Sequence, residues 1–162
     1  LYGSGLIGYI VVNVLLYITV GIEEELMFRS VVTECVLRKN SNIIVFASVY
    51  SGLLFGLAHI TNFIFDADMT MFNKWCTMIM ACVFGFTLAV IFLRTKSIGA
   101  VITLHFLWDF ADFMNHMMIV ERYRYGGSYN ALALQIPVLI VMLVIAVFVC
   151  INKSAWECKQ CF

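Results

Sequence analysis

Long apolar runs separated by short polar stretches dominate this chain of 162 residues. A helix needs about 20 mostly apolar residues to cross a bilayer. The pattern predicts five or six helical segments of roughly that size, at 6–20, 22–37, 43–60, 75–93, 98–119 and 131–151. Only Gly21 separates the first two segments, so they form either a tight hairpin or one bent helix. The sequence therefore predicts an all-α, polytopic transmembrane bundle of about five to six helices.

The composition agrees with a membrane protein. Hydrophobic residues make up 63% of the chain and charged residues 12%, whereas soluble domains are about half apolar and about a quarter charged. The formal net charge is zero, which gives no electrostatic reason to expect a nucleic-acid partner. The length suits one domain spanning residues 1–162. Because the chain starts without methionine, inside an apolar run, we expect a core truncated at its N-terminus.

The stretch "GIEEELMFRS" (21–30) places charges inside a predicted span, where they are costly and mark a candidate functional site. Successive helical residues are about 100° apart, so the three glutamates cannot share one face. Glu25 and Arg29 are four residues apart and can pair. That pairing leaves Glu24 without a local partner, while Glu23 can reach the membrane interface. The alternative is that all of these charges are interfacial and solvated.

Two further stretches carry ionisable groups. In "FGLAHI", Phe55 and His59 share a helix face; His59 is either functional or an interface residue. In "LHFLWDFADFMNHM", a stripe about 60° wide holds four polar residues: His105, Asp109, Asp112 and His116. The other side of this helix carries Phe106, Phe110, Phe113 and Met117, and we expect Phe113 to face lipid.

The polar stripe indicates a helix that faces the bundle interior or a wet cavity. Asp112 and His116 extend it, so we expect them to line a water-accessible cleft. The alternative is that His116 reaches the headgroups and Asp112 pairs with a neighbouring helix. Together, the three helices predict one intramembrane polar cavity. Its carboxylates and imidazoles suit water activation and oxyanion stabilisation, a metal site, or a non-catalytic scaffold or proton-relay protein.

Three motifs give the chain a family resemblance. "EELMFR" fits EExxxR, "FGLAH" fits FxxxH, and "HFLWD" fits HxxxN/D. In this order on separate helices, they resemble the CPBP family of intramembrane glutamic-type proteases, which includes Rce1-like CAAX prenyl endopeptidases and bacteriocin-processing (Abi) enzymes. The resemblance extends over residues 21–110.

The resemblance implies a role for each matching residue. Glu24 corresponds to the general base for water, and His59 to the histidine that works with it. His105 and Asp109 correspond to the pair that holds the tetrahedral oxyanion. Many members have asparagine at the last position, and an ionised Asp109 cannot donate a hydrogen bond. Asp109 would then orient His105 or act in its protonated form.

Glu25, Arg29 and Phe55 match the remaining motif positions and are interpreted as supporting residues. The resemblance implies an intramembrane endopeptidase that needs no cofactor and no metal. The alternative is a zinc-dependent protease, although the HExxH motif is absent. The implied partners are the lipid bilayer and a membrane-associated peptide or protein substrate. The implied location is a multi-pass integral membrane position, in the cell membrane of a bacterium or the ER membrane of a eukaryote.

Overall fold

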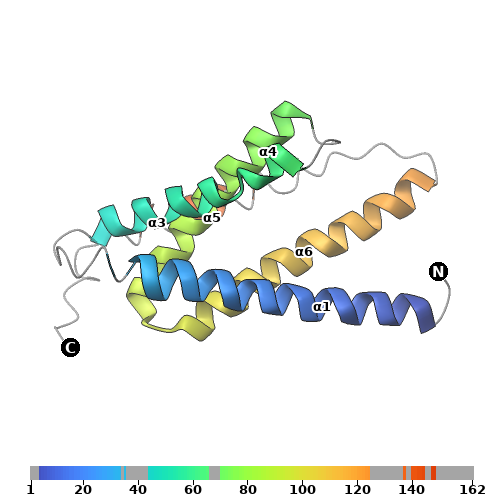
Figure 1. Cartoon of the computed structure of the whole chain (residues 1–162), viewed down its shortest axis with the longest axis horizontal. Coiled ribbons are helices and arrows are strands. Elements are labelled where there is room, and N and C mark those ends of the chain that lie inside the picture. Colours follow the sequence, from blue (N-terminus) through green and yellow to red (C-terminus); the bar gives the residue numbers. More distant parts are fainter. Residues whose placement is uncertain are drawn as a thin grey trace.

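The computed structural model describes residues 4–33, 35, 44–65, 70–124, 137, 140–144 and 147–148. Every element in these ranges is a helix (Figure 1), so the predicted all-α class is confirmed. The sixth predicted segment, 131–151, lies largely outside the described residues.

The first two predicted segments form one continuous helix. Helix α1 (Ser4–Glu25) runs directly into the π-helix η1 (Leu26–Thr33). Gly21 does not break the run: it lies against α6, where an added Cβ would meet only ordinary contacts at 3.7 Å or more. The stretch Gly5–Thr33 is long and apolar enough to cross a membrane. The glutamates therefore lie deep along a helix, where it changes from α to π geometry.

The remaining helices follow in chain order: α3 (Ile44–Ala58), α4 (Thr61–Phe65), α5 (Met71–Thr95) and α6 (Ile98–Arg124). Helix α5 is also long and apolar enough to span a membrane. The Thr70 hydroxyl caps its first turn by accepting from the Asn73 N–H at 3.3 Å. Lys96 ends α5 in the left-handed region, at φ 53°, and its N–H donates to the Phe92 carbonyl. This turn reverses the chain, and α5 and α6 diverge from it. Residues 94–97, which form the turn, are called the polar corner below.

The helices are arranged as two antiparallel pairs. Helix α1 runs beside α6, and α3 runs beside α5; the pairs approach each other around η1 and separate away from it (Figure 1). The buried core lies where they meet and is rich in aromatic residues, among them Phe28, Phe55 and Phe84. Leu88 and Val101 also belong to it. Large apolar side chains elsewhere on α1 are exposed, as expected of a surface that faces lipid. The core and the ionisable motifs therefore occupy the same region.

Glycines bring α3 and α5 into close contact. A Cβ on Gly52 would lie 2.7 Å from the Cys82 carbonyl oxygen and from the Phe86 backbone nitrogen. A Cβ on Gly56 would overlap the Cys82 sulfur. Gly52 and Gly56 form a GxxxG motif, the spacing that lets membrane helices pack backbone to backbone. This contact fixes the height and rotation of α3, which carries Phe55 and His59.

Gly52→Ala should destabilise the bundle. The added methyl group meets backbone atoms that cannot rotate away, and overpacking of this kind costs about 1–3 kcal/mol. Gly8→Ala is the matched control, since a Cβ there meets nothing within 4 Å. The measurement is the free energy of unfolding in a denaturing-detergent titration. Equal stabilities for the two variants would contradict the close packing.

Candidate active site

A buried ion pair lies at the junction of α1 and η1. The Arg29 Nε is 2.8 Å from the Glu25 Oε2, and neither side chain has any exposed surface. Among the described residues, neither Arg29 Nη atom has a hydrogen-bond partner. The guanidinium carbon lies 5.0 Å from the centre of the Phe55 ring, close enough for a cation–π interaction. Helical spacing and an aromatic face thus hold this charge pair in the core.

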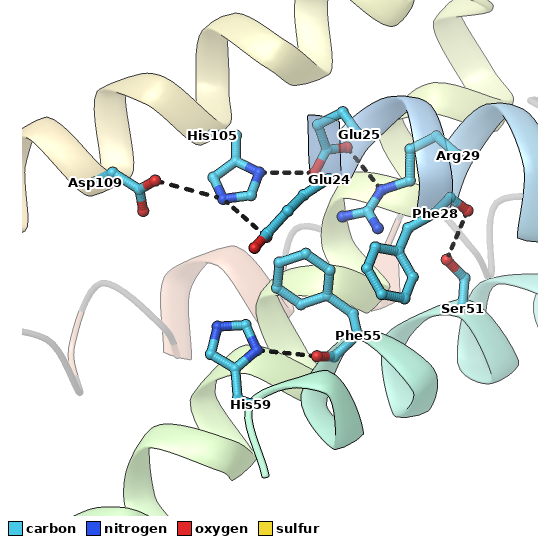
Figure 2. Close-up of polar contacts among 9 residues, drawn as sticks. All are labelled: Glu24, Glu25, Phe28, Arg29, Ser51, Phe55, His59, His105 and Asp109. Atoms are coloured by element: carbon cyan, nitrogen blue, oxygen red, sulfur yellow. Dashed lines mark hydrogen bonds and ion pairs between the residues drawn. The ribbon is translucent and has the colours of Figure 1, made fainter. Parts of the chain in front are cut away.

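His105 connects the pair to the other motif residues (Figure 2). Its Nδ1 lies 2.8 Å from the Glu25 Oε1. Because an ionised carboxylate only accepts hydrogen bonds, Nδ1 carries the proton of this bond. The Nε2 on the other edge lies 3.7 Å from the Glu24 Oε2 and 3.6 Å from the Asp109 Oδ2. These distances are too long for direct hydrogen bonds, so Nε2 faces two carboxylates without being bonded to either.

Aromatic rings fix the plane of this imidazole. Phe55 and Phe84 meet His105 edge to face, with ring centroids 5.7 and 5.3 Å apart. His105 is 4% exposed, whereas the side chains of Glu24 and Asp109 are 33% and 22% exposed. The buried edge of the imidazole is therefore anchored, and its free edge points to the more accessible carboxylates.

The end of helix α3 sets the tautomer of His59. The His59 backbone N–H donates to the Gly56 carbonyl at 3.1 Å, which leaves the Phe55 carbonyl to the His59 Nδ1, 3.0 Å away. A carbonyl can only accept, so Nδ1 is the protonated nitrogen and Nε2 is left as an acceptor. Figure 2 shows the His59 ring on the side of Phe55 toward the Glu24 carboxylate.

Comparison with known protein families identifies the family of this chain. A family model described as type II CAAX prenyl endopeptidase Rce1-like matches residues 6–111. The chain belongs to the Rce1-like family. The match includes all three motifs, in agreement with the resemblance seen in the sequence. No curated protein and no solved structure matches the chain.

Membership makes this Rce1-like chain an integral membrane protein of a peptidase family that acts on membrane-associated prenylated proteins. The structure brings some of its motif residues into contact and leaves His59 apart from Glu24. Glu24, Glu25, His105 and Asp109 form one contact cluster, but the sequence had assigned Glu25 to Arg29 alone, whereas it also binds His105. No described contact joins His59 to Glu24. His59 lies near enough to Asp109 to interact with it electrostatically.

The extension of the polar stripe is described only in part. Asp112 is half-buried and lies within electrostatic range of Asp109 and of Tyr17 on α1. His116 lies in α6, but its side chain is outside the described residues. The cleft-lining role of these two residues in the Rce1-like chain stays a prediction.

The expectation that Phe113 faces lipid is wrong. Phe113 is only 5% exposed, and its ring lies 5.8 Å from those of both Tyr9 and Tyr17 of α1. The physical reason is that α6 packs along α1, so the flank beside the polar stripe is a helix–helix contact. A periodicity of 3.6 finds the polar face but does not say which apolar flank a neighbouring helix will cover.

Sequence reasoning missed the residues that shape the site from α5. Phe84 of α5 packs on His105, and its ring centroid lies 5.0 Å from that of Trp108 on α6. A Cβ on Gly85 would lie 2.7 Å from the Phe55 Cβ, so Phe55 can sit at the centre only because position 85 is glycine. A glycine within the apolar run of this Rce1-like chain was the available signal. Among the described residues, no group of three His, Cys, Asp or Glu side chains is placed to hold a metal.

Proposed function

We propose that this protein is an intramembrane endopeptidase that hydrolyses a peptide bond with water activated by Glu24 and His59. The observation that carries the proposal is the orientation of His105, whose Nδ1 is anchored on buried Glu25 while Nε2 faces Glu24 and Asp109. A free imidazole edge beside two partly exposed carboxylates is an arrangement that suits acid–base chemistry on a bound water.

The first half of the reaction is attack by water. Glu24 accepts a proton from the water, and His59, with Nε2 as an acceptor, receives the second hydrogen bond of the same water. The oxygen then attacks the scissile carbonyl carbon, and its C=O becomes a tetrahedral oxyanion. In the proposed reaction His105 enters the step with a proton on each nitrogen: its Nδ1–H stays on Glu25, its Nε2–H donates to this oxyanion, and the imidazole neither gains nor loses a proton. Preorganised donors of this kind supply a large part of catalysis.

The second half is collapse of the intermediate. The C–N bond breaks, the oxyanion reforms a carbonyl, and protonated Glu24 returns its proton to the leaving amine. Asp109 faces the same Nε2 as Glu24 at a similar distance. It orients the imidazole when ionised and adds a second donor to the oxyanion when protonated. This assignment accommodates aspartate at a position where asparagine is common.

The substrate that fits this proposal is a peptide or protein attached to a membrane, such as a prenylated CAAX tail. Exposed apolar side chains cover α1 and the start of α5, so a lipid-anchored substrate approaches through the bilayer. The proposed location is multi-pass, in the cell membrane of a bacterium or the ER membrane of a eukaryote. A zinc-dependent protease and a non-catalytic scaffold or proton relay are the rival functions.

Purified protein in liposomes should cleave a prenylated CAAX-tail peptide, and a strong chelator should not change the rate. The reason is that Glu24 and His59 together supply the proton acceptors for water. The measurement is product formation by mass spectrometry, with the same peptide lacking its prenyl group as the matched substrate. Activity that is lost on chelation and restored by zinc would favour the metalloprotease. Absence of cleavage of both peptides would favour the non-catalytic function.

A further inference from the structure

The backbone carbonyl of Phe28, in η1, accepts hydrogen bonds from two side-chain hydroxyls. The Thr33 hydroxyl donates to the Phe28 carbonyl at 2.8 Å, and the Ser51 hydroxyl of α3 donates to the same oxygen at 3.3 Å. A carbonyl oxygen has two lone pairs and can accept both. Thr33 and Ser51 have no exposed surface. In the part of the chain that the structure describes, their hydrogen bonds go to the Phe28 carbonyl and not to the proposed reacting groups, and the proposed mechanism does not use them.

The Thr33 bond is specific to the π-helical register. Four threonines in α-helices bond the carbonyl four residues back: Thr19, Thr87, Thr95 and Thr103. Thr33 instead bonds the carbonyl five residues back, which is the spacing of a π-helix. If η1 had α geometry, the same hydroxyl would reach the Arg29 carbonyl. The bond to Phe28 therefore fits the π-helical register, and what distinguishes this register from the α-helical alternative is that the same Phe28 carbonyl also accepts from Ser51 of α3.

The Ser51 bond ties that register to α3. Ser51 directly precedes Gly52, which packs against the α5 backbone and fixes α3 in place. The Phe28 carbonyl therefore has a defined position relative to α3, and Arg29 is the next residue in the chain. From there the contacts run from Arg29 to Glu25 and from Glu25 to the His105 Nδ1. Figure 2 shows this whole series, from Ser51 to His105.

We propose that Thr33 and Ser51 are positioning residues, which hold η1 as a π-helix and thereby place Arg29, Glu25 and His105 for catalysis. Their role passes through the Phe28 carbonyl and the buried ion pair. The inference rests on the proposed function. It predicts that removing both hydroxyls lets η1 relax toward α geometry, which rotates the residues after Phe28 relative to α3.

The test uses the Thr33→Val/Ser51→Ala variant of the full chain in liposomes. Turnover of the prenylated peptide should fall by about 10- to 100-fold, the size of effect that misplacement of about 1 Å produces, while KM changes less than about twofold. Restoring one hydroxyl, as Thr33→Ser/Ser51→Ala, should recover part of the turnover. Thr87→Val is the matched control, because it removes a buried hydroxyl bond that lies within α5 and should leave turnover unchanged.

A second measurement does not depend on cleavage. In a cysteine-free background, spin labels replace exposed Val31 of η1 and exposed Val49 of α3. The distance between the labels should shift in the double variant and stay unchanged with Thr87→Val. An unchanged distance in the double variant would overturn the positioning role. If the distance shifts in the double variant but the wild-type protein does not cleave the peptide, the role of Thr33 and Ser51 in holding η1 is supported and the proposed function is rejected.

Discussion

Glu24→Gln should abolish cleavage while the protein still folds. The amide cannot accept a proton from water, and general-base catalysis contributes about 10²- to 10⁴-fold to a rate. Folding should survive because Glu24 is 33% exposed and lies outside the buried pair. The measurement is turnover of the prenylated peptide, together with the unfolding midpoint in detergent. Turnover within about twofold of wild type would remove Glu24 from the mechanism.

The adjacent glutamate is the matched control. Glu23 is exposed, and the same substitution, Glu23→Gln, makes an equal change in charge one residue away. It should leave turnover unchanged. If Glu23→Gln abolished cleavage and Glu24→Gln did not, the register of the EExxxR motif would have to move by one residue.

Arg29→Ala should destabilise the fold by about 3–5 kcal/mol, the cost of removing one partner of a buried ion pair. The Glu25 carboxylate, which has no exposed surface, would keep His105 but lose its cation. The measurement is the free energy of unfolding in detergent. Arg94→Ala is the control, because Arg94 is exposed and surface ion pairs contribute about 0–1 kcal/mol.

A double substitution separates stability from catalysis. Glu25→Gln/Arg29→Met removes both charges and replaces them with groups of similar volume, a change that is often neutral for a buried pair. It should therefore be more stable than Arg29→Ala. Turnover should stay low, because the new amide side chain would no longer present a carboxylate to the His105 Nδ1. Full turnover in this variant would show that the pair serves folding alone.

Local spacing was enough to predict much of this site. The i,i+4 relation of Glu25 and Arg29 predicted a pair that the structure contains, and the stripe on α6 placed His105 and Asp109 on one face. Such predictions succeed because helix geometry alone fixes which side chains of one helix can meet. Apolar composition predicted the all-α class for a similarly simple reason, since an isolated membrane-spanning segment must satisfy its own backbone.

Contacts between helices could not be predicted in the same way. The bond from Glu25 to His105 joins residues 80 positions apart, and no periodicity encodes the rotation of one helix against another. Phe113 illustrates the same limit, because its burial depends on α1. The π-helix was also missed: "LMFRSVVT" has no residue that breaks an α-helix, and one of the two hydroxyl bonds to the Phe28 carbonyl, that of Ser51, forms only when α3 packs against η1.

The polar corner between α5 and α6 sets the length of substrate tail that the proposed reaction requires. Arg94, Thr95, Lys96 and Ser97 are exposed there, as suits the headgroup layer, and α6 starts at Ile98. At about 1.5 Å per residue, the stretch of α6 from Ile98 to His105 is about 10 Å long, which is about a third of the thickness of a hydrocarbon layer of about 30 Å. An extended chain covers about 3.3–3.6 Å per residue. In the proposed reaction, a substrate tail of three or four unfolded residues would therefore span the distance from the corner to the imidazole, whereas a folded terminus would be held at the surface.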